Sequence, residues 1–246
     1  MIRAFRCDLH VHTCLSPCAD LDMYPTALVR KAVQEGLDLI AICDHNASEN
    51  VPYVIRAAAG LDLAVLPGME VTSREEVHVI ALFDATDPLQ HLQRTVYEHL
   101  PGMNDERRFG CQAIVNEFDE VEGFNERLLI GATELPLEDL IRQVHQLGGI
   151  AVASHIDRES FSVISQLGFV DPGIPFDALE ISRTTGLSAA RRRYPELERY
   201  PFVLSSDAHR IDDVGTGYTQ MLLAGATVCE LMLAFAGLEG RRIEAL

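Results

Sequence analysis

Histidines and carboxylates cluster where short apolar segments of the chain end. The first such segment ends in Asp8-Leu9-His10-Val11-His12. Residues two apart in a strand project to the same face, so His10 and His12 can bind one cation together. Comparable groups follow in Cys43-Asp44-His45-Asn46, Gly68-Met69-Glu70, Val77-His78-Val79-Ile80, Ala153-Ser154-His155 and Ser205-Ser206-Asp207-Ala208-His209.

Each of these groups has a simpler interpretation when it is considered alone. An isolated His78 in an apolar segment is typical of a core histidine, Asp44 of a turn, and Glu70 of a helix cap. Six of the nine histidines nevertheless lie in such groups. Because the C-terminal ends of parallel strands converge at one edge of a sheet, this joint placement favours a metal site.

The number of candidate ligands exceeds the three that one catalytic zinc ion needs. The candidates are His10, His12, His45, Glu70, His78, His155, Asp207 and His209. They are sufficient for two or three divalent ions, and mixed imidazole and carboxylate ligands suit zinc, manganese or iron better than calcium or magnesium. Such ions lower the pKa of bound water towards neutrality, which provides a nucleophile for hydrolysis.

Strands must bring these groups together, and short apolar segments do alternate with amphipathic ones along the chain. The predicted strands cover residues 5–11, 37–43, 61–66, 77–83, 150–154, 178–181, 202–205 and 220–223. The predicted helices cover residues 26–35, 48–59, 89–99, 136–147, 158–167, 185–194 and 228–236. Several strands are apolar on both faces, as in parallel sheets covered by helices. The pattern predicts an α/β fold whose sheet is closed into a barrel or open and doubly wound.

Residues 102–133 interrupt this alternation with a polar segment rich in acidic side chains, including Glu117, Asp119 and Glu120. One interpretation is a helical insertion exposed to solvent, and the other is a cap over the site. No stretch has the composition of an interdomain linker. We therefore expect a single catalytic domain over residues 1–246.

At these motifs the sequence resembles the PHP (polymerase and histidinol phosphatase) family of metal-dependent phosphoesterases. The opening Asp8-Leu9-His10-Val11-His12-Thr13 is similar to the family's first motif. The other matching segments are Cys43-Asp44-His45-Asn46, Gly68-Met69-Glu70-Val71-Thr72, the isolated His78 and His155, and the closing Ser206-Asp207-Ala208-His209. The resemblance covers nearly the whole chain.

The resemblance implies a distorted (β/α)7 barrel, in which residues 102–133 would be the helical insertion, and a site for three metal ions. It implies that the first ion is held by His10, His12, Glu70 and Asp207. Glu70 bridges to the second ion, which is also held by His78 and His155. The third ion is held by His45 and His209. Glu70 and Asp207 are accordingly the expected catalytic residues of the cluster.

In this family the third ion takes a further ligand shortly after His12, and two residues are candidates for it here. Asp20 lies five residues before Pro25, the offset of a ligating Asp in some members. Cys18 lies six residues after His12, the offset of a ligating His in others. We expect Asp20 to be the ligand. Cys18 as a soft zinc ligand is the next alternative, and a structural pair of Cys14 and Cys18 is the third.

Arginine is the other residue type that this chemistry requires, because its guanidinium donates two parallel hydrogen bonds to phosphate. Arg158 and Arg183 follow two of the predicted strands, and we expect both to contact substrate, with a surface ion pair as the alternative for each. Asp8 and Asp44 lie close to ligand histidines and are expected to orient them. These residues predict hydrolysis of a small phosphate ester, either a phosphomonoester or a nucleotide, by metal-activated water.

The net charge of the chain indicates which classes of substrate it can bind. The chain has 20 Lys and Arg residues against 37 Asp and Glu residues, a formal net charge of −17. We expect this charge to repel polyanions, which predicts a small phosphorylated substrate and no nucleic-acid polymer. No apolar run reaches the ~18 residues of a membrane span, and the first residues do not resemble a signal peptide. With six scattered cysteines, we expect a cytoplasmic protein that has reduced thiols and no membrane partner.

Two other functions are open at this point. Metal-dependent amidohydrolases also begin with His-X-His, but their sites usually need a carboxylated lysine, and Lys31 is the single lysine of the chain. A non-catalytic PHP domain that binds metal is the other alternative. It is disfavoured because none of the main ligands is missing. Histidinol phosphate, nucleotides and small phosphodiesters are all compatible with the predicted cluster.

Overall fold

Strands and helices alternate along most of the chain in the computed structural model, which describes residues 1–244. The strands are β1 (Arg3–Val11), β2 (Leu39–Ile42), β3 (Ala64–Thr72), β4 (His78–Leu82), β5 (Ala113–Val115), β6 (Val121–Phe124), β7 (Ile150–Ala153), β8 (Ala178–Ser182), β9 (Phe202–Ser205), β10 (Thr219–Leu223) and β11 (Arg242–Ile243). The α-helices are α1 (Pro25–Gln34), α2 (Val51–Ala57), α3 (Thr86–Glu98), α4 (Glu106–Phe109), α5 (Leu137–Gln146), α6 (Val163–Leu167), α7 (Leu187–Arg193) and α8 (Val228–Ala236).

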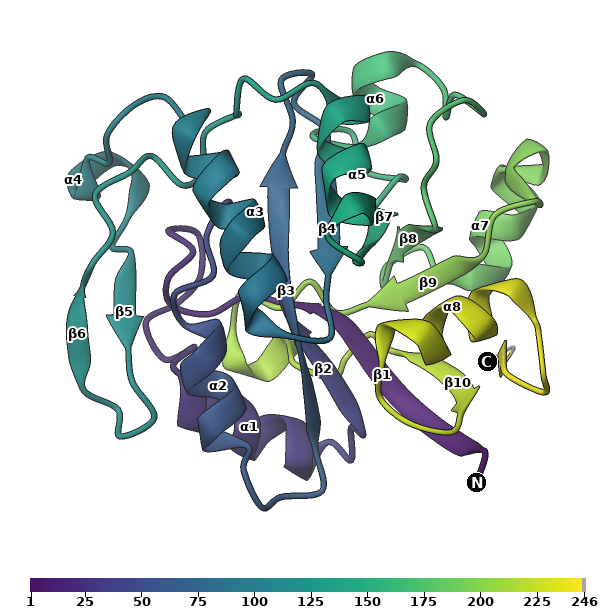
Figure 1. Ribbon diagram of the computed structural model, residues 1–246, viewed down its shortest axis with the longest axis horizontal. Helices are drawn as coiled ribbons and strands as arrows, with labels where there is room; N and C mark the ends of the chain where they lie inside the picture. The colour runs from purple at the N-terminus through teal and green to yellow at the C-terminus, as the bar shows by residue number, and fades with distance from the viewer. Residues whose placement is uncertain (245–246) are drawn as a thin grey trace.

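Nine of the strands form one sheet in the order β11-β10-β1-β2-β3-β4-β7-β8-β9. The pairs β1–β2, β2–β3, β7–β8 and β8–β9 are parallel. Strand β4 is antiparallel to both β3 and β7, because only residues 73–77 separate β3 from β4, too few for a helical crossover. The chain after β9 returns to β1, where the His12 N–H donates to the Ala208 carbonyl at 3.0 Å. The seven strands β1, β2, β3, β4, β7, β8 and β9 therefore curl into a nearly closed barrel, which confirms the predicted α/β barrel (Figure 1).

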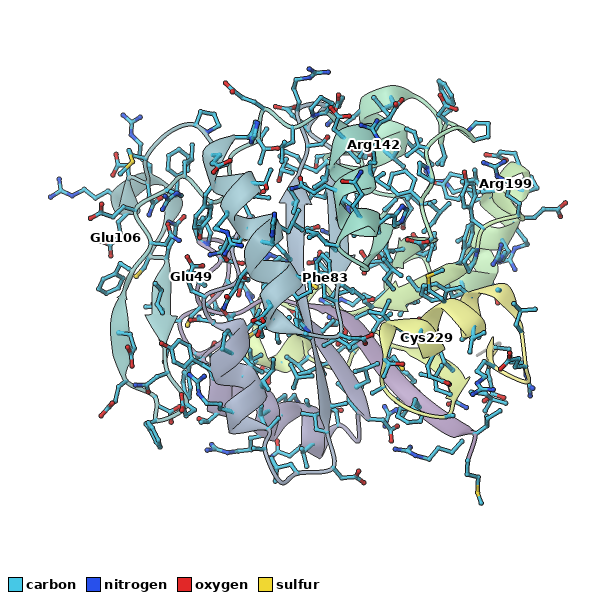
Figure 2. The ribbon with its side chains drawn as sticks, in the orientation of Figure 1. Glu49, Phe83, Glu106, Arg142, Arg199 and Cys229 are labelled. Atoms are coloured by element: carbon cyan, nitrogen blue, oxygen red, sulfur yellow. The ribbon has the colours of Figure 1, made fainter. Side chains whose placement is uncertain are left out.

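Buried apolar side chains form two large clusters, an inner one of the curled sheet with α8 and an outer one between the sheet and other helices, and a small third cluster of loop residues around Leu15 and Leu129. Leu9, Leu39 and Val152 belong to the inner cluster. The outer cluster includes Phe83, which is 1% exposed and lies next to the end of β4, near the centre of the view in Figure 2. Helix α5 shows how the outer layer forms, since its buried residues Leu137, Leu140, Ile141 and Val144 recur at the spacing of one helix face. Among the described residues, no helix is long and apolar enough to cross a membrane.

The segment 102–133 differs from the expected helical insertion. It contains one short helix, α4, and a two-stranded antiparallel hairpin of β5 and β6 that stands beside the barrel (Figure 1). The Asn116 side chain accepts hydrogen bonds from the N–H groups of Phe118 and Glu120, which stabilises a turn where a helix was expected. The end of the segment reaches the barrel, because the Asn46 side chain donates to the carbonyls of Leu129 and Gly131.

Candidate metal centre

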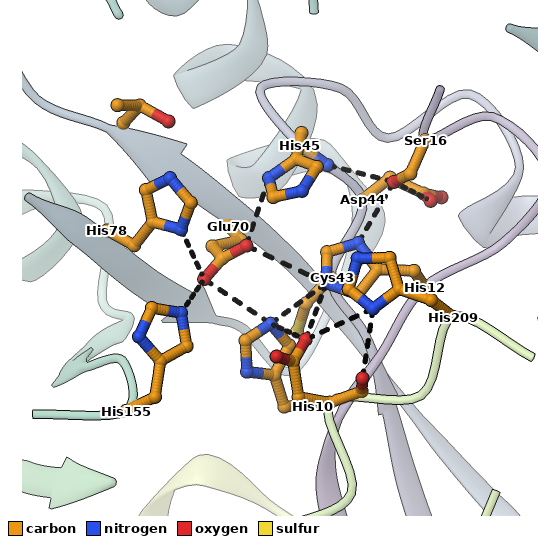
Figure 3. Close-up of polar contacts among 12 residues, drawn as sticks. His10, His12, Ser16, Cys43, Asp44, His45, Glu70, His78, His155 and His209 are labelled. Carbon is orange, nitrogen blue, oxygen red and sulfur yellow. Dashed lines mark hydrogen bonds and ion pairs between the residues drawn. The ribbon is translucent and has the colours of Figure 1, made fainter. Parts of the chain in front are cut away.

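The predicted ligands from six parts of the sheet meet at one end of the barrel (Figure 3). Strand β1 provides His10 and His12, β3 provides Glu70, and β4 provides His78. The turns after β2, β7 and β9 provide His45, His155, Asp207 and His209. Most of these side chains are buried, and His209 is the most accessible at 26% exposed.

Tight turns direct several of these side chains into the barrel. Asn46, His155 and Asp207 have φ values of +52°, +26° and +49°, in the left-handed region that residues other than glycine rarely adopt. In β1, the pairing with β2 is irregular between Asp8 and Val11, and such irregularities re-aim side chains. Three of the turns that carry the cluster therefore contain a residue other than glycine in this conformation.

Glu70 lies at the centre of the cluster. Its Oε1 is 3.0 Å from His78 Nδ1 and 3.4 Å from His155 Nε2. Its Oε2 is 3.0 Å from His45 Nδ1. Since each carboxylate oxygen faces different imidazoles, Glu70 has the position expected of a bridging ligand.

Asp207 is the second carboxylate of the cluster, and it also lies close to His10 and His12. Its Oδ1 is 3.1 Å from His12 Nε2 and 3.4 Å from His10 Nε2. His209 Nδ1 is 2.9 Å from the Asp207 carbonyl oxygen, which fixes the ring beside the cluster. The two carboxylates thus approach the same pair of histidines, because His10 Nε2 is also 3.4 Å from Glu70 Oε1.

The spacing of these atoms fits divalent metal ions. Metal–ligand bonds of about 2.0–2.2 Å place neighbouring ligand atoms roughly 3.0–3.5 Å apart. The Nε2 atoms of His10 and His12 are 3.0 Å apart, and three groups, His12/His45/His209, His10/His12/Glu70 and His45/Glu70/His78, have ligand atoms within 4.8 Å of one another. His45 Nδ1, although close to Glu70, is not aligned for a hydrogen bond and has no other hydrogen-bond partner within residues 1–244. Both features are compatible with ligand atoms arranged around a cation.

The charged groups of the cluster also shift the pKa values of one another. Burial would raise the pKa of Glu70, but the imidazoles of His78, His10 and His45 outweigh it and hold this pKa well below its usual value. Burial would lower the pKa of His10, but the carboxylates of Glu180, Glu70 and Asp207 raise it well above its usual value. The Glu70 carboxylate is therefore ionised, and protons compete with metal ions for His10.

Glu180 in β8 is a site residue that was not predicted. It is 1% exposed, and its carboxylate oxygens lie 3.0 and 3.2 Å from His10 Nδ1. It also accepts the backbone N–H of His155 at 3.0 Å. Glu180 thereby holds the far nitrogen of His10 and turns Nε2 towards the cluster. The available signal was an acidic residue within the otherwise apolar segment Ala178–Ser182.

Asp44 and Asp8 hold the loops that carry the ligands. Asp44 accepts hydrogen bonds from the Thr13 N–H and the Ser16 hydroxyl, and Ser16 Oγ is 2.9 Å from His12 Nδ1. Asp8 accepts the backbone N–H groups of Ser206 and Gly215, on either side of Asp207 and His209 in the chain. Asp44 therefore orients His12 through Ser16, whereas Asp8 positions the loop after β9.

The structure does not bring the Asp20 side chain into the cluster. Its backbone N–H is bound to the His209 carbonyl, while its carboxylate is 57% exposed and lies 3.7 Å from Arg210 Nε. The Cys18 thiol lies beside the imidazoles of His45 and His209 instead. Desolvation would raise the pKa of Cys18, but these two imidazoles outweigh it and lower the pKa to about 6. The Asp20 carboxylate is therefore not among the side chains that the structure brings together, whereas the Cys18 thiol interacts with His45 and His209.

The cluster opens into a pocket of about 190 Å³, and only one of the two predicted arginines lines it. Arg158 is at the rim, 43% exposed, with Nη2 2.5 Å from Asp207 Oδ2. Arg183 pairs with Asp213 at 2.7 Å and with the Thr216 hydroxyl, and it is not among the described residues that line the pocket. Arg183 therefore forms the surface ion pair that was the alternative to a substrate contact. Ile130 lines the pocket, so the segment 102–133 does contribute to its wall.

Comparison with known proteins identifies the family and several relatives. The PHP domain family matches residues 8–166. A 5′-3′ exoribonuclease of Haemophilus influenzae is 32% identical over 85 residues, which cover 33% of this chain and 30% of that protein. The chain thus spans about a third of the length of this relative.

Two solved structures share the fold. The lesion-specific endonuclease PfuEndoQ of Pyrococcus furiosus superposes with a TM-score of 0.74 at 15% identity, covering 98% of this chain and 58% of that one. An amidohydrolase from Chromobacterium violaceum superposes with a TM-score of 0.61 at 20% identity, covering 86% of this chain and 90% of that one.

These relatives contradict the expectation that nucleic-acid polymers are excluded. The exoribonuclease and the endonuclease are both named for action on nucleic acids. The expectation relied on the net charge of −17, but charges more than about 8 Å from a bound phosphate are largely screened at physiological salt. Groups at the rim such as Arg158 therefore matter more for one terminal phosphate than the charge of the whole surface.

Proposed function

Since the chain belongs to the PHP domain family of metal-dependent hydrolases, we propose that it hydrolyses a phosphate ester of a nucleotide or of a nucleic-acid end. The observation that carries this proposal is a cluster of six imidazoles and two carboxylates that opens into a pocket lined by Arg158. Divalent ions bound there would lower the pKa of water and offset the negative charge of phosphoryl oxygens.

The contacts described above support a set of residues that would hold two or three ions. We assign His10, His12, Glu70 and Asp207 to one ion, and Glu70, His78 and His155 to a second. The group for a third ion comprises His45, His209 and Cys18. Thiolate and imidazole ligands together favour zinc at this third position.

Other side chains would bind the substrate phosphate or orient the metal ligands. Arg158 can donate a pair of hydrogen bonds to a phosphate that enters the pocket. Glu180 and Ser16 hold the outer ring nitrogens of His10 and His12, so that their inner nitrogens remain available as ligands. The structure offers little support for the amidohydrolase alternative, because Lys31, the single lysine, lies on α1 and pairs with Glu35 at 2.7 Å.

The direct test uses protein that is stripped with a chelator and reloaded with Mn²⁺ or Zn²⁺. We expect metal-dependent hydrolysis of at least one member of a panel of p-nitrophenyl phosphate, its bis ester, nucleoside monophosphates and 5′-phosphorylated oligonucleotides. Hydrolysis of amides without hydrolysis of any phosphate ester would support the amidohydrolase alternative. Inactivity on the whole panel with every metal would contradict the proposal.

Arg158→Gln should weaken substrate binding, because a hydrogen bond to a charged group contributes about 1.5–3 kcal/mol. We expect kcat/KM to fall by about 10- to 100-fold, mostly through KM. Arg183→Gln is the matched control, since Arg183 is bound to Asp213 outside the pocket. Steady-state kinetics of both variants check this, and equal losses would contradict the role of Arg158.

Cys18→Ser should remove one metal ligand while Asp20→Asn should not. In protein loaded with Co²⁺, we expect the wild type and the Asp20 variant to show a sulfur-to-cobalt charge-transfer band, and the Cys18 variant to lack it. Cys229→Ser provides a thiol control, because Cys229 is an exposed cysteine on α8, remote in the chain from every ligand. Loss of metal from the Asp20 variant alone would reverse the assignment.

A further inference from the structure

Phe161 lies at the rim of the metal centre in an unusual conformation. It follows β7 in the loop that leads to α6, and its φ is +57°. A bulky side chain in this left-handed region is an outlier, and such outliers persist only where the surrounding structure enforces them. Here Ser162 begins α6 with a reciprocal pair of hydrogen bonds to Ser165, and its hydroxyl also donates to the Arg158 carbonyl. The loop is therefore held on both sides of Phe161.

The ring of Phe161 is placed by a ligand histidine. It stacks on the His78 imidazole with 4.7 Å between ring centroids and 16° between ring planes. The Phe161 carbonyl also accepts the His78 backbone N–H at 2.9 Å. Despite these contacts the residue is 39% exposed, so part of the aromatic surface faces solvent beside the metal ligands.

The size of the pocket determines what can lie against this ring. Its volume of about 190 Å³ is below the ~300 Å³ at which typical small-molecule sites begin. A phosphate with part of a sugar can enter, whereas the rest of a nucleotide must remain at the rim. Arg158, Ser160 and Phe161, from the loop between β7 and α6, all line the pocket.

We propose that Phe161 is the platform on which the base of the reacting nucleotide stacks while its phosphate occupies the pocket. This inference rests on the proposed phosphoesterase function and identifies the part of the substrate that gives it selectivity. Stacking on an aromatic side chain tolerates any base, since every base has a π-face. Recognition of this kind suits an enzyme that acts on ends of varied sequence.

Binding of adenosine 5′-monophosphate and of ribose 5-phosphate, which differ by the base, tests the proposal. Calorimetry with the metal-loaded protein should show the nucleotide binding at least about tenfold more tightly. Phe161→Leu keeps an apolar side chain but removes the π-face. We expect it to lose most of this preference and to bind ribose 5-phosphate within about twofold of the wild type. Phe161→Trp should restore the preference.

Phe169→Leu is the matched control, because Phe169 is 59% exposed and does not line the metal pocket in the described part of the chain. A preference that survives in Phe161→Leu would overturn the proposal. An equal loss for both ligands, together with loss of metal, would also overturn it, because Phe161 would then act only by holding His78. The binding assay does not depend on turnover, so a base preference that requires Phe161 in a protein without hydrolytic activity would contradict the proposed function and leave the platform intact.

Discussion

Glu70→Gln is expected to lower kcat on phosphate esters by at least about 1,000-fold, equivalent to ~4 kcal/mol of transition-state stabilisation. The amide has the shape of the carboxylate but no charge, and it cannot offer two anionic oxygens to His45, His78 and His155, which surround them at 3.0–3.4 Å. The variant should also bind fewer ions, because Glu70 is assigned to two of the ion positions. Elemental analysis of the purified protein provides the count.

Two further variants test whether the loss of activity is specific to the carboxylates of the cluster. Asp207→Asn should cause a comparable loss of activity, since Asp207 Oδ1 faces His12 at 3.1 Å. Glu138→Gln, on the exposed side of α5, is the neutral control and should retain full activity and metal content. If the Glu70 variant keeps its full complement of metal, Glu70 is not a bridge, whatever its activity.

The positions of the ligand histidines could be predicted because they depend on local features. Strand β2, Leu39–Ile42, is buried along its whole length, and His45 follows directly in the turn. His10 and His12 share a strand, and the spacing of two residues is enough to place them on one side. Whether such turns meet at one place depends on the order of the strands, which the β/α alternation leaves open between a closed barrel and an open, doubly wound sheet.

Contacts between distant parts of the chain could not be predicted in the same way. Glu180 binds His10 across 170 positions of sequence, and nothing near either residue identifies its partner. The choice between Cys18 and Asp20 depends on how one loop turns, since both residues satisfy a plausible spacing from His12 or Pro25. In the hairpin at residues 113–124, β6 is largely exposed, so the alternation of apolar and polar residues that marks a strand is missing.

Metal removal should have the largest effect on stability. A ligand present at 1,000 times its dissociation constant stabilises the folded protein by about 4 kcal/mol per site. A chain of this size gains roughly 2–4 °C in Tm per kcal/mol. We therefore expect saturating Mn²⁺ or Zn²⁺ to raise Tm by about 10 °C or more over the chelated protein, as measured by scanning calorimetry.

The difference in Tm between metal-loaded and chelated protein should depend on pH, because the protonation of His10 depends on pH. In the metal-free protein the carboxylates raise the pKa of His10 well above its usual value of 6.5, so its protonation stabilises the fold fully below pH 6.5. That contribution is lost as pH rises through the raised pKa. Metal binding requires the neutral imidazole and therefore strengthens over the same range. The Tm difference between loaded and chelated protein should accordingly widen from pH 6 to pH 8, and a difference that narrows would show that His10 does not exchange a proton for a metal ion.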